Sequence, residues 1–248
     1  MANLGTGLAK LDMKVCLVDA DIGLRNLDLI MGLENRIVYD LVNVVEGVVE
    51  LRKALVRDKR FDEKLYLLPA AQTREKDAVN EDQMRDLCNR LRAEFDFVIV
   101  DCPAGIEQGF RNAVAGADEA VIITTPEVSA VRDADRIVGK LESCGISKPK
   151  LILNRVRADM IRRNEMMSIE DVLEILAIKL LGVIPDDETI IVSANKGEPA
   201  VLDSASKAGE AYRNIVRRLL GEEVPVMPLE ADRGFLARLR RVMGIRAK

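Results

Sequence analysis

The 248-residue sequence predicts an α/β fold in which a mostly parallel sheet carries helices on both faces. Short runs rich in Val, Ile and Leu lack polar alternation, which is typical of strands buried on both faces. Stretches with helical periodicity separate these runs, and alternation of strands and helices favours a parallel sheet with right-handed crossovers. Apolar residues make up 48% of the chain and charged residues 31%, so the chain can bury the core of one domain.

A short amphipathic helix is expected at the start, because Leu4, Leu8 and Leu11 recur at helical spacing. The apolar run VCLVDAD at residues 15–21 then predicts a buried strand. A helix that leads into such a strand normally follows a strand of its own. We therefore expect the gene product to begin upstream of Met1, with a further strand and loop ahead of the helix.

Strands and helices alternate over the rest of the chain. Five further apolar runs predict strands at residues 65–70, 95–102, 120–125, 151–155 and 180–185. Amphipathic patterns predict helices at residues 80–95, 106–117, 128–145 and 168–177. Residues 1–220 are therefore expected to form one domain.

The C-terminal part has a different composition. Residues 221–234, GEEVPVMPLEADRG, combine prolines, acids and glycine, which is typical of a linker. Residues 235–248 predict an amphipathic helix with an apolar face and basic flanks. The apolar face comprises Phe235, Leu236, Leu239, Val242 and Met243, and the basic flanks comprise Arg238, Arg240 and Arg241.

Such a helix is typical of a segment that lies in the headgroup layer of an anionic membrane. The alternative is a terminal helix packed on its own domain. The preceding linker, the concentration of arginine and the absence of acids after Asp232 favour the membrane. Two tails joined in a dimer raise avidity by about 10²–10⁴, so membrane binding should follow dimerisation.

Composition excludes several kinds of chemistry. The chain has no histidine, which excludes His-based acid–base catalysis, Ser-His-Asp triads and histidine metal sites. The four cysteines form no CxxC pair and are expected to be buried, reduced thiols of a cytoplasmic protein. A net charge of −4 gives no overall attraction to nucleic acid, and no apolar run approaches the ~20 residues of a membrane span.

Acidic residues end two of the predicted strands: Asp19 and Asp21 in VCLVDAD, and Asp101 in FVIVD. Ligands of parallel α/β sheets bind at these carboxyl ends. An apolar strand ending in one aspartate is typical of a Walker B element, whose carboxylate holds Mg²⁺ beside nucleotide phosphates. A lone strand-terminal aspartate more often belongs to a turn or helix cap. Two such strands, followed by IGLRNLD and PAGIEQG, favour a nucleotide site.

Six segments, in order and over nearly the whole chain, resemble those of one family. They are LVDADIGLRNLDLIMGLENRIVYDLVNVVEG, VDCPAGIEQGF, TTPEVSAVRDADRI, LILNRVR, MMSIEDVLEIL and GVIPDD with SANKGEPAVLD. Together they resemble the MinD family of deviant Walker A ATPases, which regulate cell division in bacteria and plastids. The resemblance implies a P-loop NTPase-like fold.

The phosphate loop is the part of this pattern that the given sequence lacks. No GxxxxGK[ST] motif occurs, and GTGLAK at residues 5–10 lacks its spacing. In the family, a central strand and a loop with two lysines precede the helix that residues 2–10 resemble. Their absence is expected to leave the neighbouring strands unpaired. The alternative to an upstream start is a non-catalytic membrane-binding fragment, because the lysines are missing.

The resemblance also implies roles for individual acids. Asp101 matches the Walker B residue that holds Mg²⁺ through water. Asp21 matches the residue that positions the attacking water, and Asp19 supports the magnesium and phosphate region. Glu107 and Asp133 match positions of the dimer interface or of partner binding.

Three further residues match the family's adenine pocket. Asn154 resembles the asparagine that reads the base edge with its amide donor and acceptor. Pro185 and Asp187 are expected to line the same pocket. A turn residue is the alternative for Asn154, and a helix cap is an equally good account of Asp187.

The family implies an ATPase that uses ATP and Mg²⁺ and dimerises with ATP at the inner face of the cell membrane, or the stromal face in a plastid. The dimer would recruit a MinC-type inhibitor of FtsZ assembly and be released by a MinE-type activator. A ParA-type DNA-partition ATPase is the alternative from another class. The apolar face of the tail counts against it, and no specific nucleic-acid partner is expected.

Overall fold

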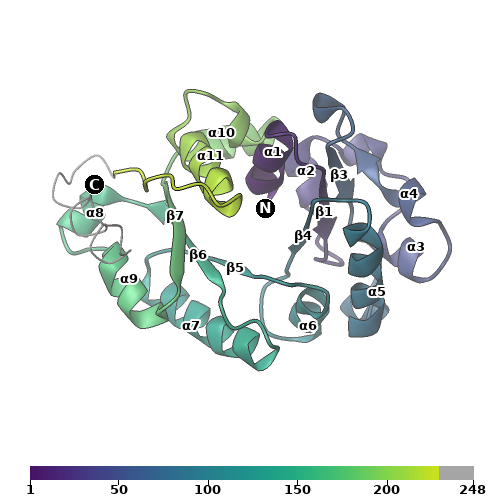
Figure 1. Ribbon diagram of the computed structural model, residues 1–248, viewed down its shortest axis with the longest axis horizontal. Coiled ribbons are helices and arrows are strands. Elements are labelled where there is room, and N and C mark those ends of the chain that lie inside the picture. The colour runs from purple at the N-terminus through teal and green to yellow at the C-terminus, as the bar shows by residue number, and fades with distance from the viewer. Residues whose placement is uncertain (229–248) are drawn as a thin grey trace.

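The computed structural model describes residues 1–228, whose strands lie in two sheets (Figure 1). The first sheet has the order β2-β3-β1-β4, and the second has the order β5-β6-β7. The strands are β1 (Val15–Asp19), β2 (Val56–Arg57), β3 (Leu65–Leu68), β4 (Phe97–Asp101), β5 (Val121–Thr124), β6 (Lys150–Val156) and β7 (Lys179–Pro185). All pairs are parallel except β2 with β3, which confirms the predicted mostly parallel α/β fold.

Helices connect the strands and cover both faces of the sheets. They are α1 (Ala2–Lys10), α2 (Leu27–Met31), α3 (Leu41–Val45), α4 (Leu51–Ala54), α5 (Glu81–Arg92), α6 (Gln108–Ala115), α7 (Val128–Ser143), α8 (Ala158–Arg162), α9 (Ile169–Leu176), α10 (Thr189–Asn195) and α11 (Lys207–Leu219). The starts of α5 and α9 are fixed by reciprocal capping boxes, Asn80 with Gln83 and Ser168 with Asp171.

One core spans both sheets on the side of α1 and α11. It joins Leu8 of α1, Leu17 of β1, Ile152 of β6 and Ile215 of α11, all of which are fully buried. The opposite face of the first sheet packs on α3, α4 and α5, and that of the second sheet packs on α7 and α9 (Figure 1). The shared core therefore holds the two sheets together on one side.

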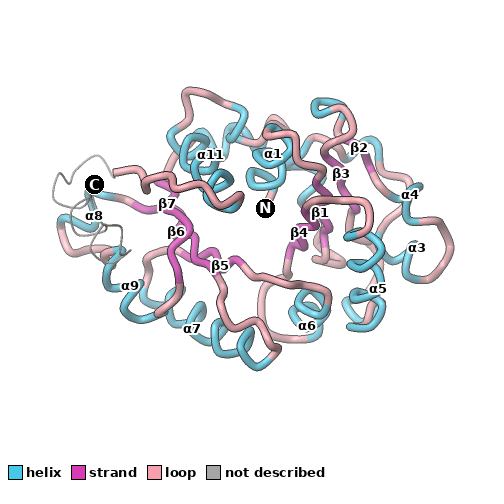
Figure 2. Tube along the Cα trace, in the orientation of Figure 1, coloured by secondary structure: helices cyan, strands magenta, loops and turns pink. Residues whose placement is uncertain are grey.

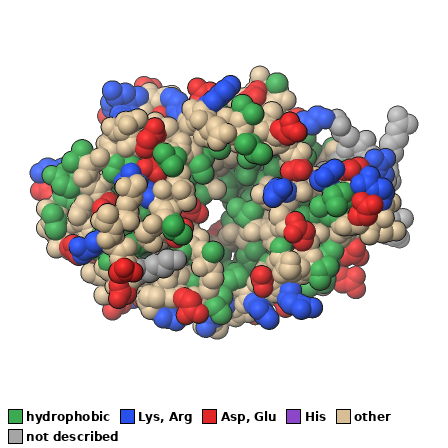
Figure 3. All heavy atoms as spheres, turned by 180° about the vertical axis from the view of Figure 1, so that it is seen from behind, with side chains coloured by type: hydrophobic (Ala, Val, Ile, Leu, Met, Phe, Trp, Pro, Cys, Tyr) green, Lys and Arg blue, Asp and Glu red, His purple; other side chains and the backbone are tan. Residues whose placement is uncertain are grey.

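The strands form two separate sheets, with a break between β4 and β5. No hydrogen-bonded pairing joins these two strands, which lie on the sides of their sheets that face the middle of the molecule (Figure 2). The molecule is hollowed there, and hydrophobic side chains surround the hollow (Figure 3).

The first residues of the predicted linker are fixed to the domain. Arg218 of α11 donates hydrogen bonds to the carbonyl oxygens of Leu181 (2.8 Å), Val224 (2.6 Å) and Pro225 (2.6 Å). Val226 is 4% exposed and packs in the core of the second sheet. The chain up to Val226 is therefore part of the domain, although its composition predicted a linker from residue 221.

The predicted amphipathic helix at residues 235–248 lies outside the described residues. Over the part of the chain that is described, no helix combines the length and the apolar character needed to cross a bilayer. All four thiols are free, but only Cys16 and Cys88 are buried, whereas Cys102 and Cys144 are exposed. The expectation that all four would be buried was therefore wrong for two of them.

Candidate functional site

The carboxylates predicted from the strand ends lie together at one edge of the first sheet. Asp19 ends β1 and Asp101 ends β4, and the two residues are direct partners in the parallel register. Asp19 is 1% exposed, and its Oδ1 accepts a hydrogen bond from the backbone N–H of Asp21 at 3.0 Å. The structure thus gathers three acids around the carboxyl ends of β1 and β4.

The surroundings of Asp19 and Asp101 disfavour the ionised form of each carboxylate. Burial raises the pKa of Asp19 to about 6, aided by the charges of Asp101 and Asp21 and offset in part by the N–H groups of Asp21 and Leu27. Burial also raises the pKa of Asp101, and the charge of Asp21 adds to the shift. A cation at this position would relieve the repulsion.

Helix α1 begins beside the same acids. Met1, at the start of this helix, lies close enough to Asp101 for the charge of that carboxylate to act on it. The carbonyl of Met1 accepts the N–H groups of Leu4 (2.9 Å) and Gly5 (3.2 Å) in the first turn. The positive end of the helix dipole is therefore directed at the site, which favours anionic groups there. The sequence did not predict that α1 reaches the carboxylates.

The residues of the site fit a magnesium ion that is shared with phosphate. Within residues 1–228, no three acidic or cysteine side chains are grouped so that they could hold a metal ion by themselves. Mg²⁺ is commonly held by one or two carboxylates, with water and phosphate oxygens as its other ligands. Oδ2 of the buried Asp19 makes no hydrogen bond of ordinary geometry within the described residues. Asp101 and Asp19 can thus supply the protein's share of such a site.

The residues predicted for a base pocket lie at the ends of β6 and β7, in the second sheet. Val156 pairs with Pro185, and the register shifts between Leu153 and Val156. Arg155, inside this irregularity, has a φ of 54°, a conformation that non-glycine residues rarely adopt. Irregularities of this kind redirect side chains beside functional sites, and this one places Asn154 next to the end of β7.

Asp187 uses its carboxylate to fix the start of two helices. Oδ1 accepts the N–H of Thr189 (2.9 Å), and Oδ2 accepts the hydroxyl of Ser206 (3.0 Å) and the N–H of Ala208 (2.9 Å). Burial by itself would raise the pKa of Asp187, but the hydrogen bonds from Ala208, Thr189 and Ser206 outweigh it and lower the pKa to about 2. This geometry favours the helix-cap account of Asp187.

The two predicted partner-binding acids lie on the surface. Glu107 directly precedes α6 and is exposed, and its side chain does not cap the helix. Asp133 lies on α7, where it forms an exposed ion pair with Arg136 at 3.7 Å. Both acids are therefore accessible, one directly before α6 and the other on α7.

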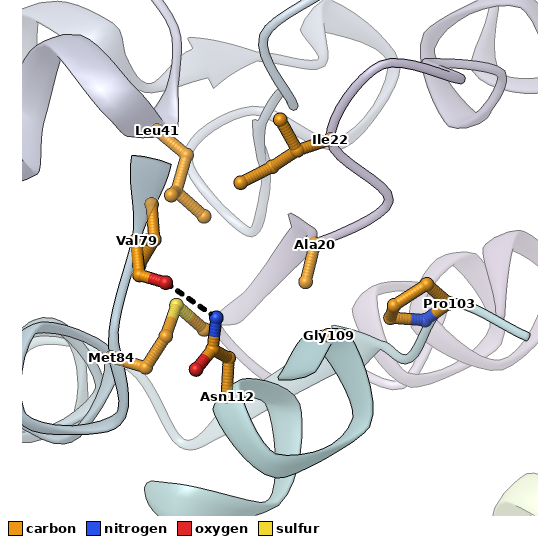
Figure 4. A pocket seen from close by; sticks show the side chains of 8 residues that line it. All are labelled: Ala20, Ile22, Leu41, Val79, Met84, Pro103, Gly109 and Asn112. Atoms are coloured by element: carbon orange, nitrogen blue, oxygen red, sulfur yellow. Dashed lines mark hydrogen bonds between the residues drawn. The ribbon is translucent and has the colours of Figure 1, made fainter. Parts of the chain in front are cut away.

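An apolar pocket lies behind the carboxylate loops (Figure 4). Its lining comprises Ala20, Ile22, Leu41, Val79, Met84, Pro103, Gly109 and Asn112. Asn112 donates to the carbonyl of Val79 at 2.6 Å and accepts from Gln108 at 2.7 Å, so its amide is already engaged. The pocket thus helps to pack the loops that carry the acids and offers no free polar group to a ligand.

Sequence reasoning missed a buried ion pair on the loop that follows Asp21. Nε of Arg25 lies 2.8 Å from Oδ2 of Asp28, which is 1% exposed. The attraction between the half-buried Arg25 and the buried Asp28 favours one conformation of this loop. Its signal in the sequence is the i, i+3 spacing of Arg25 and Asp28.

Comparison with known proteins agrees with this geometry. The family described as CobQ/CobB/MinD/ParA nucleotide binding domain matches residues 1–200. The septum site-determining protein MinD of Bacillus subtilis is 54% identical over 248 residues, covering 99% of this chain and 92% of that protein.

Two solved structures are also similar. The MinC:MinD cell division protein complex of Aquifex aeolicus matches with a TM-score of 0.85 and 46% identity, covering 92% of this chain and 91% of that one. The septum site-determining protein MinD of Pyrococcus horikoshii, complexed with Mg-ADP, matches with a TM-score of 0.80 and 27% identity, covering 90% and 92%. With a family match over most of its length and 54% identity to a relative, this chain belongs to the MinD family of septum site-determining ATPases.

Proposed function

We propose that this protein is an ATPase that places the division septum by recruiting a MinC-type inhibitor. The observation that carries the proposal is the pairing of Asp19 with Asp101 at adjacent strand ends, beside the start of α1. That edge offers carboxylates for a divalent cation and a helix N-terminus for phosphate oxygens.

Each acid has a distinct part in the proposed hydrolysis. Asp101 would hold Mg²⁺ through water, and Asp19, whose Oδ1 accepts the N–H of Asp21, would support the magnesium and phosphate region. When bound there, Mg²⁺ would supply positive charge that offsets the charge developing on the phosphate oxygens. Asp21 orients the attacking water by accepting its hydrogen bond.

We assign base recognition to the ends of β6 and β7. The amide of Asn154 offers one donor and one acceptor to the adenine edge. Pro185 packs against the base. Asp187 contributes by fixing the loop between β7 and α10 through its bonds to Thr189 and Ser206.

The proposal also covers the partners of the protein and its location in the cell, which involve residues outside the described range. The relative from Aquifex aeolicus was solved in complex with MinC, which supports a MinC-type partner for this chain. Glu107 and Asp133 are exposed and available to the dimer interface or to partners, including a MinE-type activator. Residues 235–248 bind anionic lipid at the cytoplasmic membrane face (the stromal face in a plastid), and pairing of two tails in the ATP-bound dimer makes that binding depend on nucleotide.

Nucleotide binding tests the site directly. The protein should bind ATP with Mg²⁺ in a calorimetric titration. Asp101→Asn should weaken binding in Mg²⁺ and leave binding in EDTA unchanged. Asp118→Asn, which removes an exposed ion pair with Arg92, should bind as the wild type does. Equal affinities of wild type and Asp101→Asn in Mg²⁺ would refute the assignment of Asp101.

Sedimentation with anionic liposomes tests the switch. The wild type should pellet with ATP and remain in solution with ADP. Equal pelleting with both nucleotides would discard the nucleotide dependence. Salt-sensitive retention on DNA without liposome binding would instead support the DNA-partition alternative.

A further inference from the structure

We propose that Asn112 is a positioning residue, which acts through α6 to hold the loop after Asp101 against the loop that carries Asp21. Two observations support this inference: the amide of Asn112 is buried and fully engaged, and both loops share the apolar pocket that it lines. The consequence for hydrolysis rests on the proposed ATPase function, whereas the positioning itself can be measured without nucleotide.

The apolar pocket of Figure 4 is lined by residues from both acid-carrying loops. Ala20 and Ile22 lie on either side of Asp21, and Pro103 follows Asp101 by two residues. The N–H of Ala20 also donates to the carbonyl of Asp101 at 3.3 Å, so the loops are joined where they leave β1 and β4. Because protein interiors are closely packed, the relative position of the two acids depends on what fills the space behind these loops.

Of the described residues that line this pocket, only Asn112 has a polar side chain, and it is 4% exposed. Its Nδ2 donates to the carbonyl oxygen of Val79 at 2.6 Å (Figure 4). Since a carbonyl only accepts, the amide has one productive orientation, in which Oδ1 accepts from Nε2 of Gln108 at 2.7 Å. Removal of this amide would leave buried polar groups unpaired, which folded proteins avoid.

Further bonds connect this amide to the start of α5. Oε1 of Gln108 accepts from Nη2 of Arg111 at 2.6 Å, and Nε of Arg111 lies 3.3 Å from Oε1 of Glu81, the first residue of α5. Val79 lies directly before the capping box that fixes the same helix start. The network thus fastens the first turns of α6 to the start of α5. The pair of Arg111 with Glu81 is exposed and contributes little, so the buried bond from Asn112 to Val79 is the main restraint.

Pro103 packs directly on Gly109, in the first turn of α6. A Cβ at Gly109 would lie 2.6 Å from Cγ of Pro103, so a side chain there would prevent this close contact. Gly109 and Asn112 are three residues apart and both line the pocket, which places them on one face of α6. A shift of α6 would therefore move Pro103, and with it the loop after Asp101.

The remainder of this loop is open to solvent. Residues 104–107 are exposed, and a Cβ at Gly105 would meet nothing within 4 Å. The loop is therefore anchored near its start by Pro103 and at its end by α6, and both anchors depend on the bond from Asn112.

Hydrogen exchange without nucleotide tests the positioning role. Asn112→Leu, which keeps the approximate size of the side chain and removes its amide, should speed exchange at the N–H of Ala20 by about tenfold or more. Amides inside β6, in the second sheet, should change by less than about threefold. Arg111→Leu is the matched control, because it removes the exposed end of the same network and should leave exchange at Ala20 unchanged. Unchanged exchange at Ala20 in Asn112→Leu, or equal acceleration there and in β6, would overturn the proposal.

A second variant disturbs the loop without altering the amide, and it decides the matter if Asn112→Leu does not fold. Gly109→Ala favours the helix, but its Cβ would displace Pro103. It should speed exchange at Ala20 by about threefold or more. Gly139→Ala in α7 is the matched control, because a Cβ there would meet nothing within 4 Å. Equal exchange at Ala20 in these two variants would overturn the proposal.

Steady-state ATP hydrolysis tests the consequence for the proposed function. Asn112→Leu and Gly109→Ala should lower kcat by about tenfold and leave KM for ATP within about threefold, because the acids remain present but are misplaced. Ser168→Ala weakens the fold through the N-cap of α9, in the other sheet, and should keep the kcat of the wild type. An equal loss of kcat in Ser168→Ala, or a change confined to KM, would overturn the positioning role. If exchange at Ala20 responds as expected but the wild type does not hydrolyse ATP, the positioning of the loops stands and the proposed ATPase function fails.

Discussion

Arg60 donates a hydrogen bond from its guanidinium to the carbonyl oxygen of Gly197 at 3.0 Å, across 137 positions of sequence. The same guanidinium binds the carbonyl of Met31 at 2.7 Å, at the end of α2. It is held in place by Asp58, a carboxylate that is almost fully buried. Arg60 thereby ties α2, the helix that follows Asp19 and Asp21, to the loop after α10.

Arg60→Ala should lower the free energy of unfolding by about 2–4 kcal/mol, because removing one partner leaves the buried charge of Asp58 poorly compensated. Arg57→Ala is the matched control, since Arg57 forms an exposed ion pair with Glu63 at 3.6 Å and should cost less than about 1 kcal/mol. Urea unfolding of both variants measures the difference. Equal losses would contradict a stabilising role for the guanidinium of Arg60.

Gly32→Ala should destabilise the protein more than Gly47→Ala, by about 1 kcal/mol or more. Both glycines have positive φ, 65° and 73°, so both substitutions incur the left-handed backbone cost. A Cβ at Gly32 would also lie 2.9 Å from the carbonyl oxygen of Gly197, whereas a Cβ at Gly47 would meet nothing within 4 Å. Thermal unfolding compares them, and identical midpoints would show that the contact with Gly197 adjusts freely.

Asp19→Asn should stabilise the metal-free protein at pH 7 by about 1–3 kcal/mol. The native pKa of Asp19, about 6, is raised from an ordinary 3.8, so the native state holds a proton that the unfolded chain releases. Stability is therefore full below pH 4 and falls as the pH rises from about 4 to 6. Asparagine keeps an oxygen for the N–H of Asp21 and removes the charge.

Unfolding in EDTA at several pH values measures this effect. The difference between Asp19→Asn and the wild type should disappear below pH 4. The same variant should lose ATPase activity. Asparagine removes the negative charge of Asp19, which the proposed magnesium and phosphate site requires, although it stabilises the fold. A variant less stable than the wild type at pH 7 would contradict the prediction.

Asp187→Asn should cost about 1 kcal/mol at neutral pH, as expected for a weakened helix cap at a partly exposed site. The native pKa of Asp187 is lowered to about 2, so its contribution is present above pH 4 and is lost as the pH falls from about 4 to 2. Asp186→Asn is the control, because Asp186 forms an exposed ion pair with Arg155 at 3.6 Å. Chemical unfolding between pH 2 and 6 should show the gap between Asp187→Asn and wild type closing with acid. A difference in stability that does not change with pH would contradict the capping role of Asp187.

The sequence predicted the parallel strands because their signal is local. Apolar runs without alternation identify β1 and β4, and the structure confirms both. Strand β2 was missed, since Val56–Arg57 is too short to show any periodicity. Which strands pair depends on segments that are far apart in the sequence. The break between β4 and β5 could therefore be expected only from the family resemblance.

The candidate site likewise has features that the sequence predicted and features that it did not. Asp19 and Asp101 were predictable as neighbours, because the carboxyl ends of parallel strands share one edge. The left-handed conformation of Arg155 was not, since arginine carries no signal for it. The bond from Arg60 to Gly197 was not predictable either, because nothing near either residue identifies the other.

The three hydrogen bonds of Arg218 give the end of the chain a mechanical connection to the sheet. A force on the chain beyond Val226 would act on the hydrogen bonds from Arg218 to the carbonyls of Val224 and Pro225. Arg218 would transmit this force to β7 through its bond to Leu181. Tension applied beyond Val226 therefore reaches β7 through the side chain of Arg218, as well as the last turn of α11 along the backbone.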